Sequence, residues 1–216
     1  PLRIVFGAIF GFVYAPLVIT GLHHMSNAID LQLIADFGGT MLWPMIALSN
    51  IAQGSAVLGM IYLQKNDAQA QEVNIPSCIS CYLGVTEPAM FGVNLKHSYP
   101  FICGMIGSAC ASIVCVATNS TANAIGVGGL PGILSMQPQS MLTFAICMLI
   151  AVAVPFVLTV MVGKKKLQPK EVKSVEEVKS AEVTELKAFA TGDVIALKEV
   201  NDGVFSAGTM GEGFAI

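Results

Sequence analysis

Charged residues are scarce in this chain of 216 residues, and their scarcity limits what the protein can be. Only 12% of the residues are Asp, Glu, Lys or Arg, whereas 54% are hydrophobic; a soluble domain carries about 25% charged residues. The net charge of −3 gives no support for nucleic-acid binding. Most charges lie after residue 163. The part before that residue therefore has the composition of a membrane protein.

Paired metal-ligating motifs are also missing. Among the six cysteines, Cys78 and Cys81 have C-x-x-C spacing, but no second pair and no βαβ pattern accompanies them. The other cysteines lie in apolar runs, where a free cysteine packs as a small hydrophobic side chain. We therefore expect no metal and no cofactor. The glycine-rich residues 126–132 lack the Lys-Ser/Thr ending of a phosphate loop, and we interpret them as a flexible membrane loop.

Long uncharged runs are what the sequence has in abundance. Crossing a bilayer takes roughly 20 apolar residues, and the candidates are residues 4–22, 41–63, 99–117 and 141–162. One such run can be a buried helix of a soluble protein, but four in one chain indicate an all-α polytopic membrane protein. Arg3 before the first run is typical of a signal peptide, yet the run is too long and no cleavage pattern follows. We interpret it as a spanning helix.

The composition changes twice after the last run. Three lysines follow Gly163, and the positive-inside rule places this end of the chain in the cytoplasm. Residues 167–188 mix Lys and Glu without aromatics, as expected of a solvated linker. From Phe189 short apolar pieces alternate with turn residues, which predicts the truncated start of an all-β domain. The expected domains are thus residues 1–166, 167–188 and 189–216.

Two stretches of the membrane part do not have the pattern of simple spans. Residues 21–40 carry two histidines and two aspartates, and residues 78–94 are apolar except for Glu87. The flanks of Glu87 are too short to cross, and irregular backbone at membrane depth must be surrounded by protein or by a water-filled cavity. Pro88 donates no backbone N–H and favours an extended Glu87. The pattern predicts a re-entrant hairpin with Glu87 at its tip.

Glu87 needs a partner, because an acidic side chain at the centre of a membrane helix costs about 2.5–3.5 kcal/mol on insertion scales. Backbone N–H groups and Thr86 are one set of partners. A ligand is another: an ionised carboxylate only accepts hydrogen bonds, which suits a solute rich in hydroxyl groups, but also a proton or a cation. His23 and His24 both donate and accept, and because they are adjacent on a helix, we expect at most one to contact a ligand.

Polar residues also occur inside the second run. Ser49, Asn50 and Gln53 share one helical face by their spacing. Hydrogen bonds between helices are the usual role of such residues in membranes, and we prefer that role to lining a pore. His97, beside Lys96, is interpreted as an interfacial residue.

Three segments carry a family resemblance: residues 84–94 (GVTEPAMFGVN), residues 19–25 (ITGLHHM) and residues 42–56 (LWPMIALSNIAQGSA). The first is similar to a G-[IV]-T-E-P signature and the second to a T-G-hydrophobic-H-H stretch. Both belong to the sugar-translocating enzyme IIC of the bacterial phosphoenolpyruvate-dependent phosphotransferase system, in its glucose and sucrose/trehalose branch. The chain resembles this family over about residues 1–166, with the detail most like trehalose permeases and with sucrose or β-glucoside permeases as the alternative. The tail from Ala190 resembles the start of the glucose-type enzyme IIA domain, a β sandwich.

The resemblance implies a homodimer in the cytoplasmic membrane, with the linker and tail in the cytoplasm, that moves a disaccharide by an elevator motion and phosphorylates it. It implies that Glu87 and His23 bind the sugar, with His24, Thr86 and Gly84 at the same site, and it makes Glu87 a candidate general base. Specificity is expected to depend on the pocket shape around Tyr82, Phe91 and Trp43.

The phosphate carriers of such a system are expected outside this chain. The phosphocysteine of the IIB domain would precede Pro1, and the phosphohistidine of IIA, supplied by HPr, would follow Ile216, so we expect a fragment of a sugar phosphotransferase without a phosphorylation site. Two other classes stay open: a transporter coupled to protons or cations, with Glu87 as the ion site, and a regulatory or scaffold membrane protein.

Overall fold

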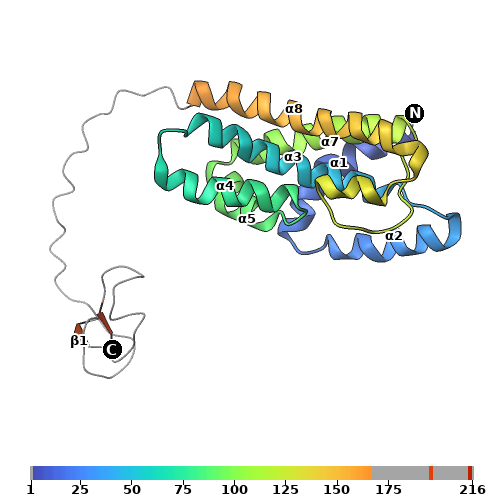
Figure 1. Ribbon diagram of the computed structural model, residues 1–216, viewed down its shortest axis with the longest axis horizontal. Helices are drawn as coiled ribbons and strands as arrows, with labels where there is room; N and C mark the ends of the chain where they lie inside the picture. Colours follow the sequence, from blue (N-terminus) through green and yellow to red (C-terminus); the bar gives the residue numbers. More distant parts are fainter. Residues whose placement is uncertain (1, 167–194, 197–213, 216) are drawn as a thin grey trace. The chain divides into compact units, whose positions relative to one another are not determined.

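The computed structural model describes residues 2–166, 195–196 and 214–215 (Figure 1). The chain divides into two units, Pro1–Gln168 and Pro169–Ile216. The described part of the first unit consists of helices and their connecting loops. In chain order its elements are α1 (Leu2–Ile19), α2 (His24–Phe37), α3 (Leu42–Leu63), α4 (Ala68–Tyr82), α5 (Glu87–Ala89), the π-helix η1 (Met90–Asn94), α6 (Leu95–His97), α7 (Tyr99–Ala117), the 3₁₀ helices η2 (Leu130–Ser135) and η3 (Pro138–Ser140), and α8 (Met141–Lys166).

The second unit is described at two short strands. These are β1 (Ile195–Ala196) and β2 (Phe214–Ala215), which pair antiparallel, with Ile195 opposite Ala215. The expected linker, residues 167–188, and most of the expected β domain lie outside the described residues. The β sandwich therefore stays a prediction.

Four helices of the first unit are long and apolar enough to cross a membrane: α1, α3, α7, and α8 together with the turn before it. They correspond to the four uncharged runs, so the all-α membrane architecture is confirmed. In the central helix, α3, 78% of the most apolar window is buried, against 28% in α1 and 22% in Pro138–Lys166. Large apolar side chains such as Phe6 and Leu149 are exposed on the outer helices. Exposed apolar faces of this kind are compatible with contact to lipid hydrocarbon.

Helix α3 packs against α4, α7 and α8 (Figure 1), and the contacts combine small residues with hydrogen bonds between helices. A Cβ at Gly54 of α3 would lie 3.0 Å from the Cβ of Cys81 in α4, so these two helices approach closely. The Asn94 Nδ2 group donates to Gln53 Oε1 over 2.7 Å, and Gln53 Nε2 donates to the carbonyl of Phe101 over 3.4 Å. The expected role in hydrogen bonding between helices is confirmed for Gln53, whereas Ser49 Oγ has no partner among the described residues.

The segment around Glu87 is a hairpin. Since α3 ends and α7 begins at the same end of the bundle, the chain enters and leaves the hairpin from one side (Figure 1). Its first arm, α4, has 15 residues, or about 22 Å at 1.5 Å per residue, which is less than the hydrocarbon layer of roughly 30 Å. Residues 83–86 form the tip, and Glu87 follows directly. The predicted hairpin is thus present, and its re-entrance into the membrane stays a prediction.

The expected conformation of Glu87 was wrong. Glu87 is not extended but opens α5, and Pro88 lies in the first turn of that helix. A proline costs little there, because the N–H groups of a first helical turn have no partner within the helix. The helix start therefore lies at the carboxylate.

Candidate functional site

Glu87, His23, His24, Thr86 and Gly84 line a single cavity of about 140 Å³. His23 and His24 lie at the turn into α2, and the other three residues lie at the tip of the hairpin. The other lining residues come from α1, α2, α3 and the glycine-rich loop; they are Tyr14, Val18, Asn27, Trp43, Ile46, Asn50 and Gly128. The structure thus brings together every site residue proposed from the sequence.

The carboxylate of Glu87 is exposed, and it accepts no hydrogen bond from any residue in the part of the chain that the structure describes. The alternative in which Thr86 and backbone N–H groups satisfy it is therefore not what the fold shows. Within residues 2–166 and the two short strands, no group of three or more His, Cys, Asp or Glu side chains is placed to hold a metal ion. Glu87 is left available to a ligand.

His23 and His24 both border the cavity. His23 ends the turn after α1 and His24 begins α2, so the pair lies across a helix start, and the ring centroids are 3.9 Å apart. Both can therefore line one cavity, because they do not lie within one continuous helix; that at most one of them contacts a ligand stays a prediction. Burial, followed by the charge of His24, lowers the pKa of His23, although Glu87 opposes the shift. His23 is therefore neutral at pH 7 and can both donate and accept.

The hairpin tip is held against α3 and the glycine-rich loop. Asn50 Nδ2 donates to the carbonyl of Gly84 over 3.3 Å. Gly84 has a φ of 102°, and a Cβ there would lie 2.9 Å from the backbone of Gly128. Gly129, also at positive φ, lies against the carbonyl of Tyr82. Gly128 is thus a packed part of the wall of the site, and the interpretation of residues 126–132 as a flexible loop missed that role.

Asp30 is a buried acidic residue to which sequence reasoning gave no role. Its Oδ1 accepts from the Thr40 hydroxyl over 2.5 Å and from the backbone N–H of Trp43 over 3.0 Å. Both bonds tie α2 to the first turn of α3. Burial raises the pKa of Asp30, while these two hydrogen bonds act in the opposite direction. The only signal for Asp30 in the sequence is an acidic side chain in a largely apolar stretch.

The aromatic residues expected to shape the pocket separate into two groups. Trp43 lines the cavity. The Tyr82 hydroxyl instead lies 3.0 Å from Ser55 Oγ, and Phe91 is 55% exposed on the hairpin; neither lines the cavity. Of the three, only Trp43 is placed to affect specificity by contact.

The C-x-x-C cysteines have a packing role, as predicted. The thiol of Cys78 donates to the carbonyl of Gly54 over 3.4 Å, and that of Cys81 donates to the carbonyl of Asn50 over 3.2 Å. Both are buried and free. These contacts bind the first arm of the hairpin to α3.

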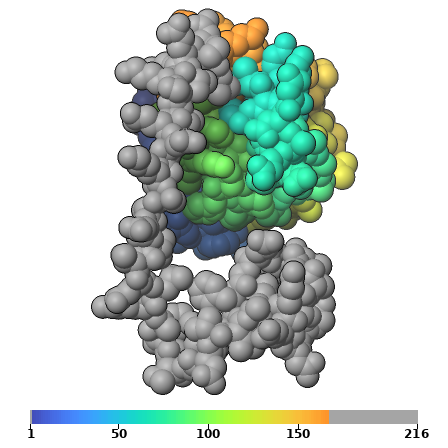
Figure 2. Space-filling view, turned by 90° about the vertical axis from the view of Figure 1, so that its left-hand side faces the viewer, coloured from blue at the N-terminus to red at the C-terminus, as the bar shows by residue number. Residues whose placement is uncertain are grey.

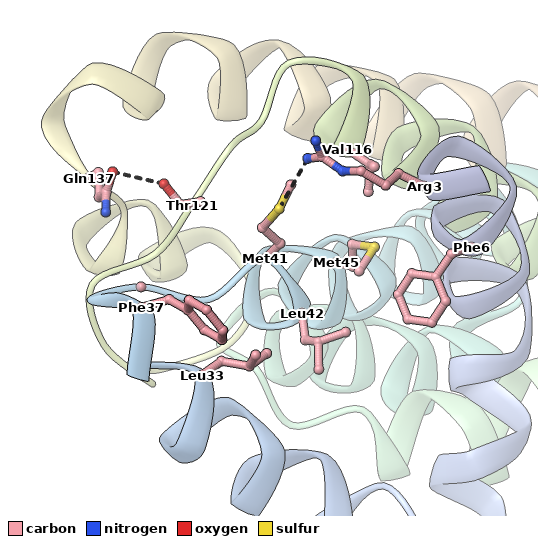
Figure 3. Close-up of a pocket in the computed structure, with 11 residues that line it drawn as sticks. Arg3, Phe6, Leu33, Phe37, Met41, Leu42, Met45, Val116, Thr121 and Gln137 are labelled. Atoms are coloured by element: carbon pink, nitrogen blue, oxygen red, sulfur yellow. Dashed lines mark hydrogen bonds between the residues drawn. The ribbon is translucent and has the colours of Figure 1, made fainter. Parts of the chain in front are cut away.

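A second cavity of about 520 Å³ lies among α1, α2, α3 and the segments that follow α7 and η2 (Figure 3). Its few polar groups are already engaged: Thr121 Oγ1 donates to Gln137 Oε1 over 2.8 Å, and Arg3 donates to the sulfur of Met41 over 3.3 Å (Figure 3). No carboxylate or imidazole lines it. A solute rich in hydroxyl groups would find few partners there.

Comparison with known proteins agrees with the resemblance. Residues 2–108 match the family model described as phosphotransferase system, EIIC, and residues 184–216 match the model of the phosphoenolpyruvate-dependent sugar phosphotransferase system, EIIA 1. The chain belongs to the phosphotransferase-system EIIC family in its membrane unit, and the start of an EIIA 1 segment follows. It is an integral membrane protein.

Curated relatives give the same assignment. The chain is 55% identical over 159 residues to the PTS system trehalose-specific EIIBC component of Escherichia coli (strain K12), a match covering 74% of this chain and 33% of that protein. It is 50% identical over 162 residues to the sucrose-specific EIIBC component of Pasteurella multocida (strain Pm70), covering 74% and 34%. The trehalose-specific EIIBC component of Bacillus subtilis (strain 168) is 50% identical over 151 residues, covering 69% and 32%. The chain spans about a third of the length of these relatives. No solved structure matches it.

Proposed function

We propose that this chain forms the sugar-binding part of a phosphotransferase-system permease, which carries a disaccharide across the bacterial cytoplasmic membrane and phosphorylates it. The observation that carries the proposal is the single cavity in which Glu87, His23, His24, Thr86 and Gly84 meet. Trehalose is the proposed substrate, since two trehalose-specific proteins are among the relatives that match it best. Sucrose or a β-glucoside is the alternative.

The chemistry of the cavity fits a neutral solute with many hydroxyl groups. Glu87 only accepts hydrogen bonds, whereas neutral His23 and the amides of Asn27 and Asn50 also donate. A hydroxyl group can donate a hydrogen bond to the carboxylate and accept one from an N–H group. Each bond to the carboxylate contributes roughly 1.5–3 kcal/mol. Binding sites for bare cations gather several oxygen ligands, but this cavity offers one carboxylate among groups that donate. A proton- or cation-coupled transporter is therefore the weaker candidate.

We place the open end of the hairpin in the cytoplasm. A side chain at Gly163 of α8 would meet Leu63 of α3 and Tyr99 of α7, so these helix ends lie together. Figure 2 looks onto this end of the bundle, with α8 and the connection from α3 to α4 in view. Lysines lie at all three helix ends: Lys65 follows α3, Lys96 precedes α7, and residues 164–166 end α8. The positive-inside rule then assigns them, and the tail beyond, to the cytoplasm.

Phosphoryl transfer would take place from that side. The phosphate would come from a IIB phosphocysteine domain, which is charged by IIA and HPr, and the membrane unit would work as a homodimer. In-line transfer depends chiefly on positioning the acceptor hydroxyl, and this is the task proposed for Glu87 and His23. In this arrangement residues 1–166 are the transport domain, residues 167–188 a linker and residues 189–216 the start of the IIA-like β domain.

Uptake by the full-length protein tests the proposal. Expressed in a bacterial strain without its own trehalose and sucrose permeases, the protein should take up labelled trehalose and deliver it as a sugar phosphate. Uptake should require the phosphoenolpyruvate-dependent carriers and persist when a protonophore removes the proton gradient. Unphosphorylated product and uptake that collapses with the gradient would instead establish the cation-coupled alternative.

Substituting Gly84 by Ala in the full-length protein should lower uptake at least tenfold. A Cβ at a φ of 102° is strained, and at 2.9 Å from the Gly128 backbone it would push the hairpin tip away from the loop. Gly92→Ala is the matched control in the same hairpin, because its Cβ would lie at an ordinary 3.4 Å from Val73. Equal uptake by the two variants would contradict the tight contact at the tip.

Sugar affinity should depend on pH through His23. The pKa of His23 lies below the ordinary histidine value, so affinity should be constant from pH 8 to about 6.5 and fall below it, by up to about tenfold per unit, as His23 takes up a proton. An imidazolium cannot accept a hydrogen bond, and it attracts Glu87 away from the sugar. Binding measured across this range should become flat in His23→Gln but not in His97→Gln. A fall that survives in His23→Gln would exclude this residue.

A further inference from the structure

Trp43 has a polar atom without a partner at the proposed sugar site. It lies in the first turn of α3, its side chain is only 7% exposed, and it borders the cavity of Glu87. Its indole Nε1 is buried and has no acceptor among the residues that the structure describes. Buried indole N–H groups usually find an acceptor, so the partner of this one is missing from the part of the chain that the structure describes.

A second unpartnered atom lies on the same cavity. Nδ1 of His23 is likewise buried without a hydrogen bond within the described part of the chain. Two residues that line one cavity, one in the turn before α2 and one at the start of α3, thus each have a buried polar atom without a partner among the described residues. A ligand with polar groups, bound between them, supplies the simplest common partner.

We propose that Trp43 is a sugar-binding residue, whose Nε1–H donates to a hydroxyl oxygen and whose ring packs against the C–H face of the sugar. This inference rests on the proposed function and extends it. Indole only donates and the carboxylate of Glu87 only accepts, so together they select a solute that has both capacities. A sugar hydroxyl has both. A bare cation has no acceptor for Trp43.

The fold holds Trp43 in place before any ligand arrives. Its backbone N–H donates to Asp30 Oδ1 over 3.0 Å, and the Thr40 hydroxyl, which donates to the same oxygen, accepts from the N–H of Leu42 over 3.1 Å. These bonds fix the first turn of α3 against α2. A side chain that is already ordered loses little freedom on binding, which favours Trp43 as a fixed contact for the sugar.

Paired variation of protein and sugar tests the proposal. The full-length wild type and its Trp43→Phe variant are compared in binding to trehalose and to a series of its monodeoxy analogues. Wild type should bind one analogue about tenfold more weakly than trehalose, because that analogue lacks the hydroxyl that accepts from Nε1. Trp43→Phe should bind trehalose about tenfold more weakly and should not distinguish it from that analogue.

Two further variants separate contact from structure. Trp43→His keeps a ring N–H and should restore part of the lost discrimination. Tyr82→Phe, which removes a hydroxyl that has a partner in Ser55 and does not line the cavity, should leave the whole analogue series unchanged.

The results also separate this inference from the function on which it rests. If Trp43→Phe weakens every analogue by the same factor as trehalose, Trp43 does not donate to the sugar, while the proposed function stands. If wild type binds no disaccharide, the proposed function fails, and the role of Trp43 fails with it.

Discussion

Replacing Glu87 by Gln should weaken sugar binding by roughly thirtyfold. The glutamine amide keeps the size of the side chain and one acceptor, but it turns bonds assisted by charge into neutral ones, which are about half as strong. For two such bonds the loss is about 2 kcal/mol, and each 1.4 kcal/mol corresponds to a factor of ten. Glu87→Ala should lose still more, because no acceptor remains.

Binding by the purified full-length protein, measured by titration calorimetry, checks this result. Glu72→Gln is the matched control: Glu72 is an exposed carboxylate in α4, the other arm of the hairpin, and does not line the cavity. It should bind sugar as wild type does. Wild-type affinity in Glu87→Gln would remove the carboxylate from the site.

The variant Glu87→Gln also shows whether Glu87 acts as the general base. Phosphorylation is measured at saturating sugar with a phosphorylated IIB domain, so that weaker binding no longer limits the rate. A residue that takes the hydroxyl proton should contribute 10²- to 10⁴-fold. An unchanged rate at saturation would leave Glu87 with a binding role alone.

Substituting Asp30 by Ala should both loosen the fold and weaken sugar binding. The change leaves the Thr40 hydroxyl and the Trp43 N–H buried without their acceptor, and each unpaired group costs roughly 1–3 kcal/mol. Removal of the buried charge offsets part of this cost, so a net loss of about 2 kcal/mol, or roughly 5 °C in melting temperature, is expected. Affinity should fall about tenfold, since Trp43 and α2 form two walls of the site.

Asp30→Asn separates the hydrogen bonds from the charge. Its Oδ1 can accept from the same two donors, while the amide takes the place of Oδ2, which has no partner among the described residues. The variant should therefore lose less melting temperature and less sugar affinity than Asp30→Ala, and the loss that remains is that of amide N–H groups without an acceptor among the described residues. Should Asp30→Asn prove as damaging as Asp30→Ala, the charge of Asp30, and not its two bonds, would be what the site requires; Thr40→Val then tests one bond alone.

The hairpin and its carboxylate were predictable because the reasons for them are local. The length of an apolar segment decides whether it can span the bilayer. An acidic residue within such a segment costs free energy in hydrocarbon, whichever segments pack around it. The spans and the position of Glu87 at the tip follow from these facts. The backbone at Glu87 was mispredicted, because the preference of a residue before proline is weak against the start of a helix.

The contacts across the site could not be predicted in the same way. Nothing near Trp43 in the sequence indicates that its indole N–H lacks an acceptor among the described residues, and nothing near Gly128 indicates that the hairpin tip lies against it. Both facts depend on which elements pack together, and apolar packing is not directional enough to be deduced from one sequence.

By itself, then, the sequence determined that this chain lies in a membrane, which segments cross it and where the single acidic residue of the apolar segment 78–94 lies, since the cost of charge in hydrocarbon acts on each segment alone. Only the tertiary structure decided that His23 and His24 share one cavity, that Asp30 joins α2 to α3, and that Trp43, which lines the same cavity, has an indole N–H without an acceptor among the described residues. Those facts arise from close packing between distant segments, in which the position of each side chain depends on all its neighbours.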